Sequence, residues 1–141
     1  MKSLQINTGV EEYRLNDAVS VYLNPADPGF VKRLLDRFSE LEQQDKAWRE
    51  KLKAIEDPAE ALKAYDDGDH MFRSAVDDVL GEGVCSALLG SVSVLAFADG
   101  APIWMNILLA IMDIIDDAVS REQSAVNPKL EQYLKKYRRK K

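Results

Sequence analysis

Two long uncharged runs limit what this chain can fold into more than any other feature does. Residues 83–98 carry no charged side chain, and after Asp99 a second uncharged run covers residues 100–112. A membrane-spanning helix needs about 20 apolar residues in a row, and Asp99 leaves both runs shorter than that. We therefore expect no membrane segment, and we expect these residues to fill a core or to contact an apolar partner.

Proline positions predict where the helices begin. Four of the five prolines directly follow Asn or Asp. The Asn or Asp side chain can accept hydrogen bonds from N–H groups of the first helical turn, and proline at the next position has no N–H group to leave unpaired. These pairs predict helices that begin near Pro28, Pro58 and Pro128.

The first two predicted helices carry apolar seams with alternating spacings of three and four residues. A helix over residues 28–56, followed by one from Pro58, predicts an antiparallel helical hairpin. Asp45 and Asp69 interrupt the seams, and Gly68 weakens the second helix, so either the arms splay at this level or another segment covers the gap. The candidate core residues are Val31, Leu34, Phe38, Leu41, Trp48, Leu52, Phe72, Val76, Ile107 and Ile111.

The second half of the chain predicts a central apolar helix. Residues 102–125 are apolar around most of the helix circumference for three turns, which is typical of a helix at the centre of a bundle or against a partner. A short helix is expected in residues 84–90. Residues 91–99 form a compact apolar segment whose pattern fits a helix or a strand equally well.

The N-terminal residues 1–24 alternate apolar and polar side chains in short pieces. Turn-forming residues at Gly9 and Asp17 separate these pieces. The pattern therefore predicts several short strands, with Ile6 in the first of them. The predicted fold is mainly α: a helical hairpin plus a central apolar helix in a small bundle, with a short N-terminal β-hairpin or meander.

Composition and charge indicate one globular domain with an acidic body. We expect a single domain over residues 1–141, with strands in 1–24, a helical body in 28–125 and a basic helix or tail in 128–141. The last segment carries +6 of a total charge of −5, so that residues 1–127 carry −11. Such an acidic body disfavours nucleic-acid binding, and the basic end suits a helix C-terminus.

The residues that could carry chemistry do not combine into a catalytic set. His70 is the only histidine, which excludes a multi-histidine metal site within one chain. We interpret the acidic group in residues 65–70 as a solvated helix face, and the three acids in residues 113–117 as the solvent-facing end of a helix. Cys85 is expected to pack in the core, because thiols in apolar surroundings are usually inert. We expect no enzymatic activity, no cofactor and no metal.

The helix that begins near residue 102 is the candidate partner-binding surface. Trp104 and Leu108 lie one turn apart, and Asp in either position is expected to leave the helix content intact while abolishing association. Asp at Ile107 or Ile111, on the opposite face, is expected to unfold the protein, because an unpaired buried carboxylate is costly. The candidate partner-binding residues are Trp104, Met105, Leu108 and Met112.

Several stretches of this sequence resemble a known family. "VYLNPADPGFVKRLLDRFSELEQQ" resembles an opening of the form V-x-F-N-P-x-D-P-x-F-A-x-R. "VCSALLGSVSVLAFADGAPIWMNILLAIMD" resembles a later block, V-C-x-A-L-F-G-x-x-N-x-x-A-L-A-D-G-x-P-x-W-x-N-L-x-L-A-I-x-D, which is followed by "REQSAVNPKLEQYLKKY". Over residues 18–137 the chain is thus similar to small tail-module proteins of phages and prophages that resemble the tail assembly chaperones of long-tailed phages. It departs from the pattern at Leu23 and Ser93, where Phe and Asn are expected.

The resemblance implies a non-enzymatic function in the cytoplasm of a bacterial host. A tail assembly chaperone binds the tape measure protein, a very long, apolar and helix-rich chain, and keeps it soluble until tail tube subunits polymerise around it. The expected partners are therefore the tape measure protein, further copies of the chain in a homo-oligomer, and as an additional candidate the tail tube subunits.

Two other functions stay open from the sequence. One is a structural tail component, such as a completion or terminator protein, that is retained in the virion. The other is a nucleic-acid-binding regulator that uses the basic tail, against which the −11 charge of residues 1–127 argues.

Overall fold

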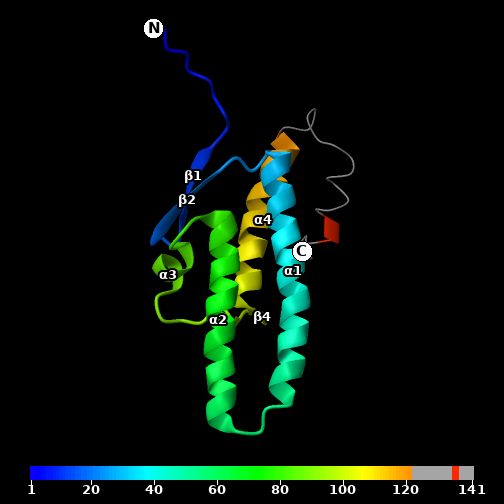
Figure 1. Ribbon diagram of the computed structural model, residues 1–141. Helices are drawn as coiled ribbons and strands as arrows, with labels where there is room; N and C mark the ends of the chain where they lie inside the picture. Colours follow the sequence, from blue (N-terminus) through cyan, green and yellow to red (C-terminus); the bar gives the residue numbers. More distant parts are fainter. Residues whose placement is uncertain (122–134, 137–141) are drawn as a thin grey trace.

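The computed structural model describes residues 1–121 and 135–136, and these form a mainly helical protein with an N-terminal β-hairpin (Figure 1). The predicted fold class is therefore confirmed. The elements are, in order, β1 (Glu11–Leu15), β2 (Val19–Leu23), α1 (Pro28–Lys53), α2 (Pro58–Leu80), α3 (Val84–Leu89), β3 (Phe97–Ala98), β4 (Ala101–Pro102) and α4 (Ile103–Arg121).

Helices α1 and α2 begin where the proline pairs predict. The Asp27 carboxylate accepts a hydrogen bond from the N–H group of Gly29 at 2.9 Å, and Asp57 accepts one from Ala59 at 3.2 Å. Each proline occupies a first-turn position whose N–H group would have no helical partner. The predicted helix start at Pro128 and the basic tail lie outside the described residues.

The N-terminal β-hairpin pairs β1 with β2 in antiparallel register, with Tyr13 opposite Val21. Its turn contains Asn16 and Asp17, both at positive φ, which is a conformation that Asn and Asp tolerate better than most residues. The prediction that Ile6 lies in a strand is wrong. Residues 1–10 have no regular secondary structure and pair with no strand of the described chain.

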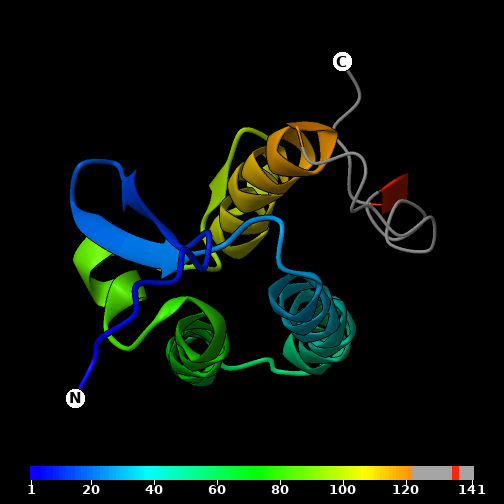
Figure 2. The same cartoon turned by 90° about the horizontal axis from the view of Figure 1, so that it is seen from above.

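The core lies where α1, α2 and α4 meet. Figure 2 shows α4 beside the antiparallel pair formed by α1 and α2. Trp104 of α4 stacks on Phe38 of α1 at 6.2 Å between ring centroids and meets Phe72 of α2 edge-on at 5.7 Å. Of the predicted core, the buried residues are Val31, Leu34, Phe38, Leu41, Phe72, Val76, Ile107 and Ile111.

Residues 91–99, whose pattern fitted a helix or a strand, form turns and the short strand β3 ahead of a tight turn. Asp99 and Gly100 both have positive φ and join the short strands β3 and β4, in which Phe97 pairs with Pro102. Asp-Gly is a favoured pair for a two-residue hairpin turn. The segment before β3 is a series of turns rather than a helix. No helix in the described part of the chain is long and apolar enough to cross a membrane.

Candidate functional site

An apolar groove lies on the part of the α1–α2 hairpin that is nearest to the connection between the two helices. Figure 1 shows that this end of the hairpin extends beyond the start of α4. We call this site the hairpin groove. It is lined mainly by Ala47, Trp48, Lys51 and Leu52 from α1, by Ile55 from the connection after α1, and by Ala64, Asp67, Gly68 and Met71 from α2.

Trp48 forms the wall of the hairpin groove at which the two helices meet. Its indole N–H group donates a hydrogen bond to the carbonyl oxygen of Ala64 at 3.3 Å. Its ring also contacts Tyr65 edge-on, with 4.9 Å between the ring centroids. These two contacts fix the orientation of the indole across the helix pair, so that its apolar surface is held in place while part of it stays exposed.

Gly68 makes this close approach possible. A Cβ atom at this position would lie 2.9 Å from the Trp48 Nε1 atom and 3.2 Å from a methyl group of Leu95. The residue that lowers the helix propensity of α2 therefore lets the Trp48 indole and the loop before α4 pack directly on the α2 backbone.

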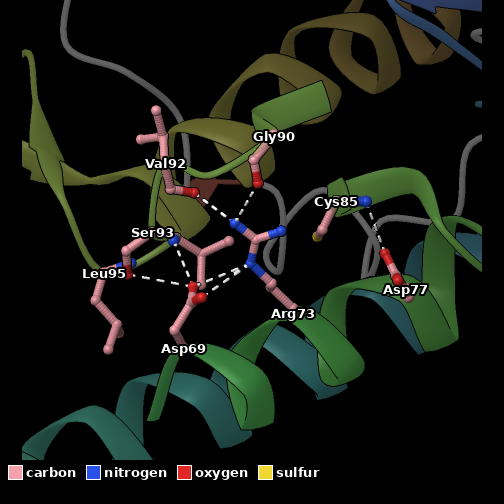
Figure 3. Close-up of polar contacts among 9 residues, drawn as sticks. Asp69, Arg73, Asp77, Cys85, Gly90, Val92, Ser93 and Leu95 are labelled. Carbon is pink, nitrogen blue, oxygen red and sulfur yellow. Dashed lines mark hydrogen bonds and ion pairs between the residues drawn. The ribbon is translucent and has the colours of Figure 1, made fainter. Parts of the chain in front are cut away.

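Asp69 and Arg73 hold the loop before α4 against α2, as Figure 3 shows. The Asp69 carboxylate accepts hydrogen bonds from the N–H group of Val94 at 2.8 Å and from the Ser93 hydroxyl at 3.2 Å. Arg73 pairs with Asp69 at 3.0 Å and donates to the carbonyl oxygen of Val92 at 2.6 Å. We call these contacts the Asp69–Arg73 network.

The prediction of a solvated acidic face is wrong for Asp69. Its side chain is only 14% exposed, and that of Arg73 is 15% exposed. The gap that Asp69 makes in the apolar seam is covered by the loop of residues 90–95, whose backbone groups bond to the network. Of the two alternatives that the sequence left open, the structure therefore shows the second: another segment covers the gap at Asp69.

Asp45, which interrupts the other seam, belongs to a second polar contact. Its carboxylate pairs with Arg49 one turn later at 2.9 Å. The guanidinium group of Arg49 lies 5.3 Å from the ring centroid of Phe97 and so makes a cation–π contact with the β3–β4 turn. Both seam acids thus belong to contacts that connect the hairpin with residues 90–97.

The surroundings of the hairpin groove combine exposed apolar side chains with charges of both signs. Met71 is 42% exposed, and Tyr65 and Leu62 nearby on α2 are 48% and 71% exposed. Lys51 lies on the α1 side of the hairpin groove and Asp67 on the α2 side. A helix with one apolar face fits such a site, because its apolar face can cover the exposed side chains while polar groups on its flanks meet Lys51 and Asp67.

The structure corrects the predicted partner-binding residues. Trp104 is 2% exposed, Leu108 0% and Met112 1%, so all three belong to the core, because α4 turns this face toward α1 and α2. Met105 is partly buried and packs against the same core. Trp48 and Leu52 show the reverse: predicted as core, they are only partly buried and line the hairpin groove.

Cys85 lies in the core and is a poor nucleophile. Burial and the neighbouring Asp77 carboxylate raise the pKa of its thiol to about 12. Asp77 itself accepts hydrogen bonds from the N–H groups of Gly83 and Cys85 at the start of α3. Among the described residues, no group of three or more His, Cys, Asp and Glu side chains could hold a metal ion.

Comparison with known proteins adds no family or fold assignment. The chain matches no protein-family model, no curated protein and no solved structure.

Proposed function

We propose that this protein is a non-enzymatic phage tail assembly chaperone that binds the tape measure protein and keeps it soluble during tail assembly. The proposal rests on the resemblance of residues 18–137 to that family and on the apolar surface of the α1–α2 hairpin. It places the protein in the cytoplasm of the bacterial host, with self-association and contact with tail tube subunits as further parts of the same proposal.

The hairpin groove is the observation that carries the proposal. A chaperone for a long helical chain needs an exposed apolar surface that accepts one face of a helix. The hairpin groove offers Leu52 and Met71 on adjacent faces of two helices, with Ile55 of the connection beside them. Its rim predicts the charge pattern of the bound helix: acidic residues toward Lys51 and basic residues toward Asp67.

Co-expression with the tape measure protein of the same tail module tests this proposal. The soluble fraction of the tape measure protein is expected to rise several-fold with the wild-type chain. Met71→Asp is expected to remove that gain, because the new carboxylate has to lose its water when an apolar helix docks. Ser74→Asp is the matched control: it adds the same charge to an exposed position of α2 that does not line the hairpin groove.

Two outcomes count against the proposal. If the wild-type chain neither raises the solubility of the tape measure protein nor co-purifies with it, the chaperone function is wrong. If mass spectrometry finds the protein in purified virions at stoichiometric amounts, a structural tail component is the better assignment.

A further inference from the structure

The N-terminal residues 1–10, which we call the N-terminal arm, expose an apolar face that nothing in the described structure covers. Leu4 is 84% exposed, Ile6 79% and Val10 54%. Leu4 and Ile6 are separated by one polar residue, and an extended chain places two such residues on the same face. Val10 follows the turn at Gly9. A segment of this kind is suited to dock as a β-strand with one apolar side.

The root of the N-terminal arm is fixed so that its end points away from the body. The side-chain amide of Asn24 donates a hydrogen bond to the carbonyl oxygen of Thr8 at 2.9 Å. Gly9 has a φ of 74°, and its N–H group bonds to the Asn7 side chain at 2.9 Å. Beyond this anchored turn the N-terminal arm leaves the rest of the protein, as Figure 1 shows.

An apolar groove runs between β1 and α4. Its apolar lining includes Leu15 of β1, Leu88 of α3, and Ile103, Ile107, Ala110 and Ile114 of α4, and its polar lining is Arg14, Asn16 and Asn106. We call it the α4 groove. In the described chain β1 pairs only with β2, so the other edge of β1 has no strand beside it. An added strand could bond to that edge and lay its apolar face on α4.

The dimensions and charges of the two surfaces agree. Beyond the turn at Gly9, residues 1–7 span about 23 Å when extended, and the twelve residues from Ile103 to Ile114 rise about 17 Å along α4. Lys2 is the only charged side chain in the N-terminal arm. The same side of α4 continues beyond Ile114 with Asp117, so an arm that runs parallel to β1 brings the Lys2 cation toward Asp117, one turn before Arg121.

We propose that the N-terminal arm of one chain docks in the α4 groove of a second copy, as a third strand beside β1. Two copies that exchange their arms form a closed dimer, because each supplies one arm and one groove. The dimer leaves the hairpin groove free, so this inference does not depend on the proposed function.

Complementation between two variants of the full-length chain tests the exchange. Ile6→Asp damages the arm and Ala110→Arg fills the groove, while Gln5→Asp, on the other face of the arm, is the matched control. By light scattering we expect dimers for the wild type and for Gln5→Asp, and monomers for the other two variants, with dissociation constants raised about 100-fold or more. An equimolar mixture of Ile6→Asp and Ala110→Arg should form a heterodimer, since one intact arm meets one intact groove.

A disulfide experiment distinguishes exchange from docking within one chain. A chain with both Ile6→Cys and Ala110→Cys should oxidise to a covalent dimer, and a mixture of the two single variants should cross-link as well. A monomeric double variant with an internal disulfide overturns the proposal. It is also overturned if the wild type is monomeric at about 100 μM, or if Ile6→Asp dimerises as the wild type does. Circular dichroism confirms that each variant is folded.

Discussion

The two ends of the α1–α2 hairpin carry the same kind of apolar seam but use it differently. At the end near α4 the seam is closed: Phe38, Phe72 and Val76 are all 0% exposed. At the other end the seam continues through Trp48 and Leu52, which are only partly buried. The two ends differ in burial because α4, which begins at Ile103, packs along only one part of the hairpin.

This difference shows that a seam of constant spacing does not by itself predict burial. Spacing determines which side chains share a face of a helix, whereas burial depends on what packs against that face. Here the outer end is stabilised by polar contacts of the loop before α4, and its apolar side chains stay partly exposed. Substitutions at matched positions of the two ends can test this account.

The largest expected effect is that of cavity formation at the closed end. Phe72→Ala should lower the free energy of unfolding by about 3–5 kcal/mol, because a fully buried aromatic ring is removed between α1 and α4. Met71→Ala, its neighbour in the hairpin groove, should lower it by less than about 1 kcal/mol. Urea unfolding measures both, and equal losses at the two positions would contradict the comparison.

A smaller loss is expected when the Asp69–Arg73 network is broken. Asp69→Ala removes the acceptor of the Arg73 Nε–H group and of the Val94 N–H group, which should cost about 2–3 kcal/mol. Hydrogen exchange of residues 90–95 should speed up in the same variant. Asp66→Ala, at an exposed position of α2, is the control, and a similar loss there would show that the network adds nothing specific.

The contact between Gly68 and Trp48 should give an effect of about 1–2 kcal/mol. At an exposed helix position Gly→Ala stabilises by up to about 1 kcal/mol. Gly68→Ala should instead destabilise, because the new methyl group meets the indole at 2.9 Å. Combining it with Trp48→Leu should remove most of the loss; a loss that persists in the double variant would place the strain elsewhere.

Cys85 reports whether the closed end excludes solvent, and at neutral pH its expected effect on stability is the smallest. The thiol pKa of about 12 lies above the value of about 8.5 expected in the unfolded chain. Its contribution to stability is therefore complete below pH 8.5 and is lost as the pH rises toward 12. At pH 8 a thiol reagent should modify Cys85 only at the rate of unfolding, and rapid labelling of the folded protein would contradict this.

The sequence predicted the hairpin well and the orientation of α4 poorly. Asp27 and Asp57, each before a proline, determine helix starts through contacts within the first turn, so the predicted starts of α1 and α2 are confirmed. Trp104 and Leu108 were expected on a partner-binding face. In a helix that is apolar on all sides, however, the apolar residues alone do not indicate which side faces the core. The available signal was polar: Asn106, Asp113 and Ser120 recur every seven residues and mark the side of α4 away from Trp104.

The Asp69–Arg73 network could not be predicted from the seam. Asp69 bonds to Ser93 and Val94, which lie 24 and 25 residues later in the chain. Nothing in residues 65–70 themselves distinguishes an acid that binds a distant loop from one that faces solvent. Contacts of this kind depend on the tertiary arrangement, which also determines that Trp48 lines a groove and Trp104 fills the core.

The two tryptophans offer the most direct test of the central claim that the hairpin groove, and not the face of Trp104, binds the partner. In the Trp104→Phe variant Trp48 is the only source of tryptophan fluorescence, and in Trp48→Phe Trp104 is. Titration with an amphipathic helical peptide from the tape measure protein should shift Trp48 emission to shorter wavelength in a saturable way, and leave Trp104 emission unchanged. A saturable shift of Trp104 emission with none for Trp48 would contradict the account.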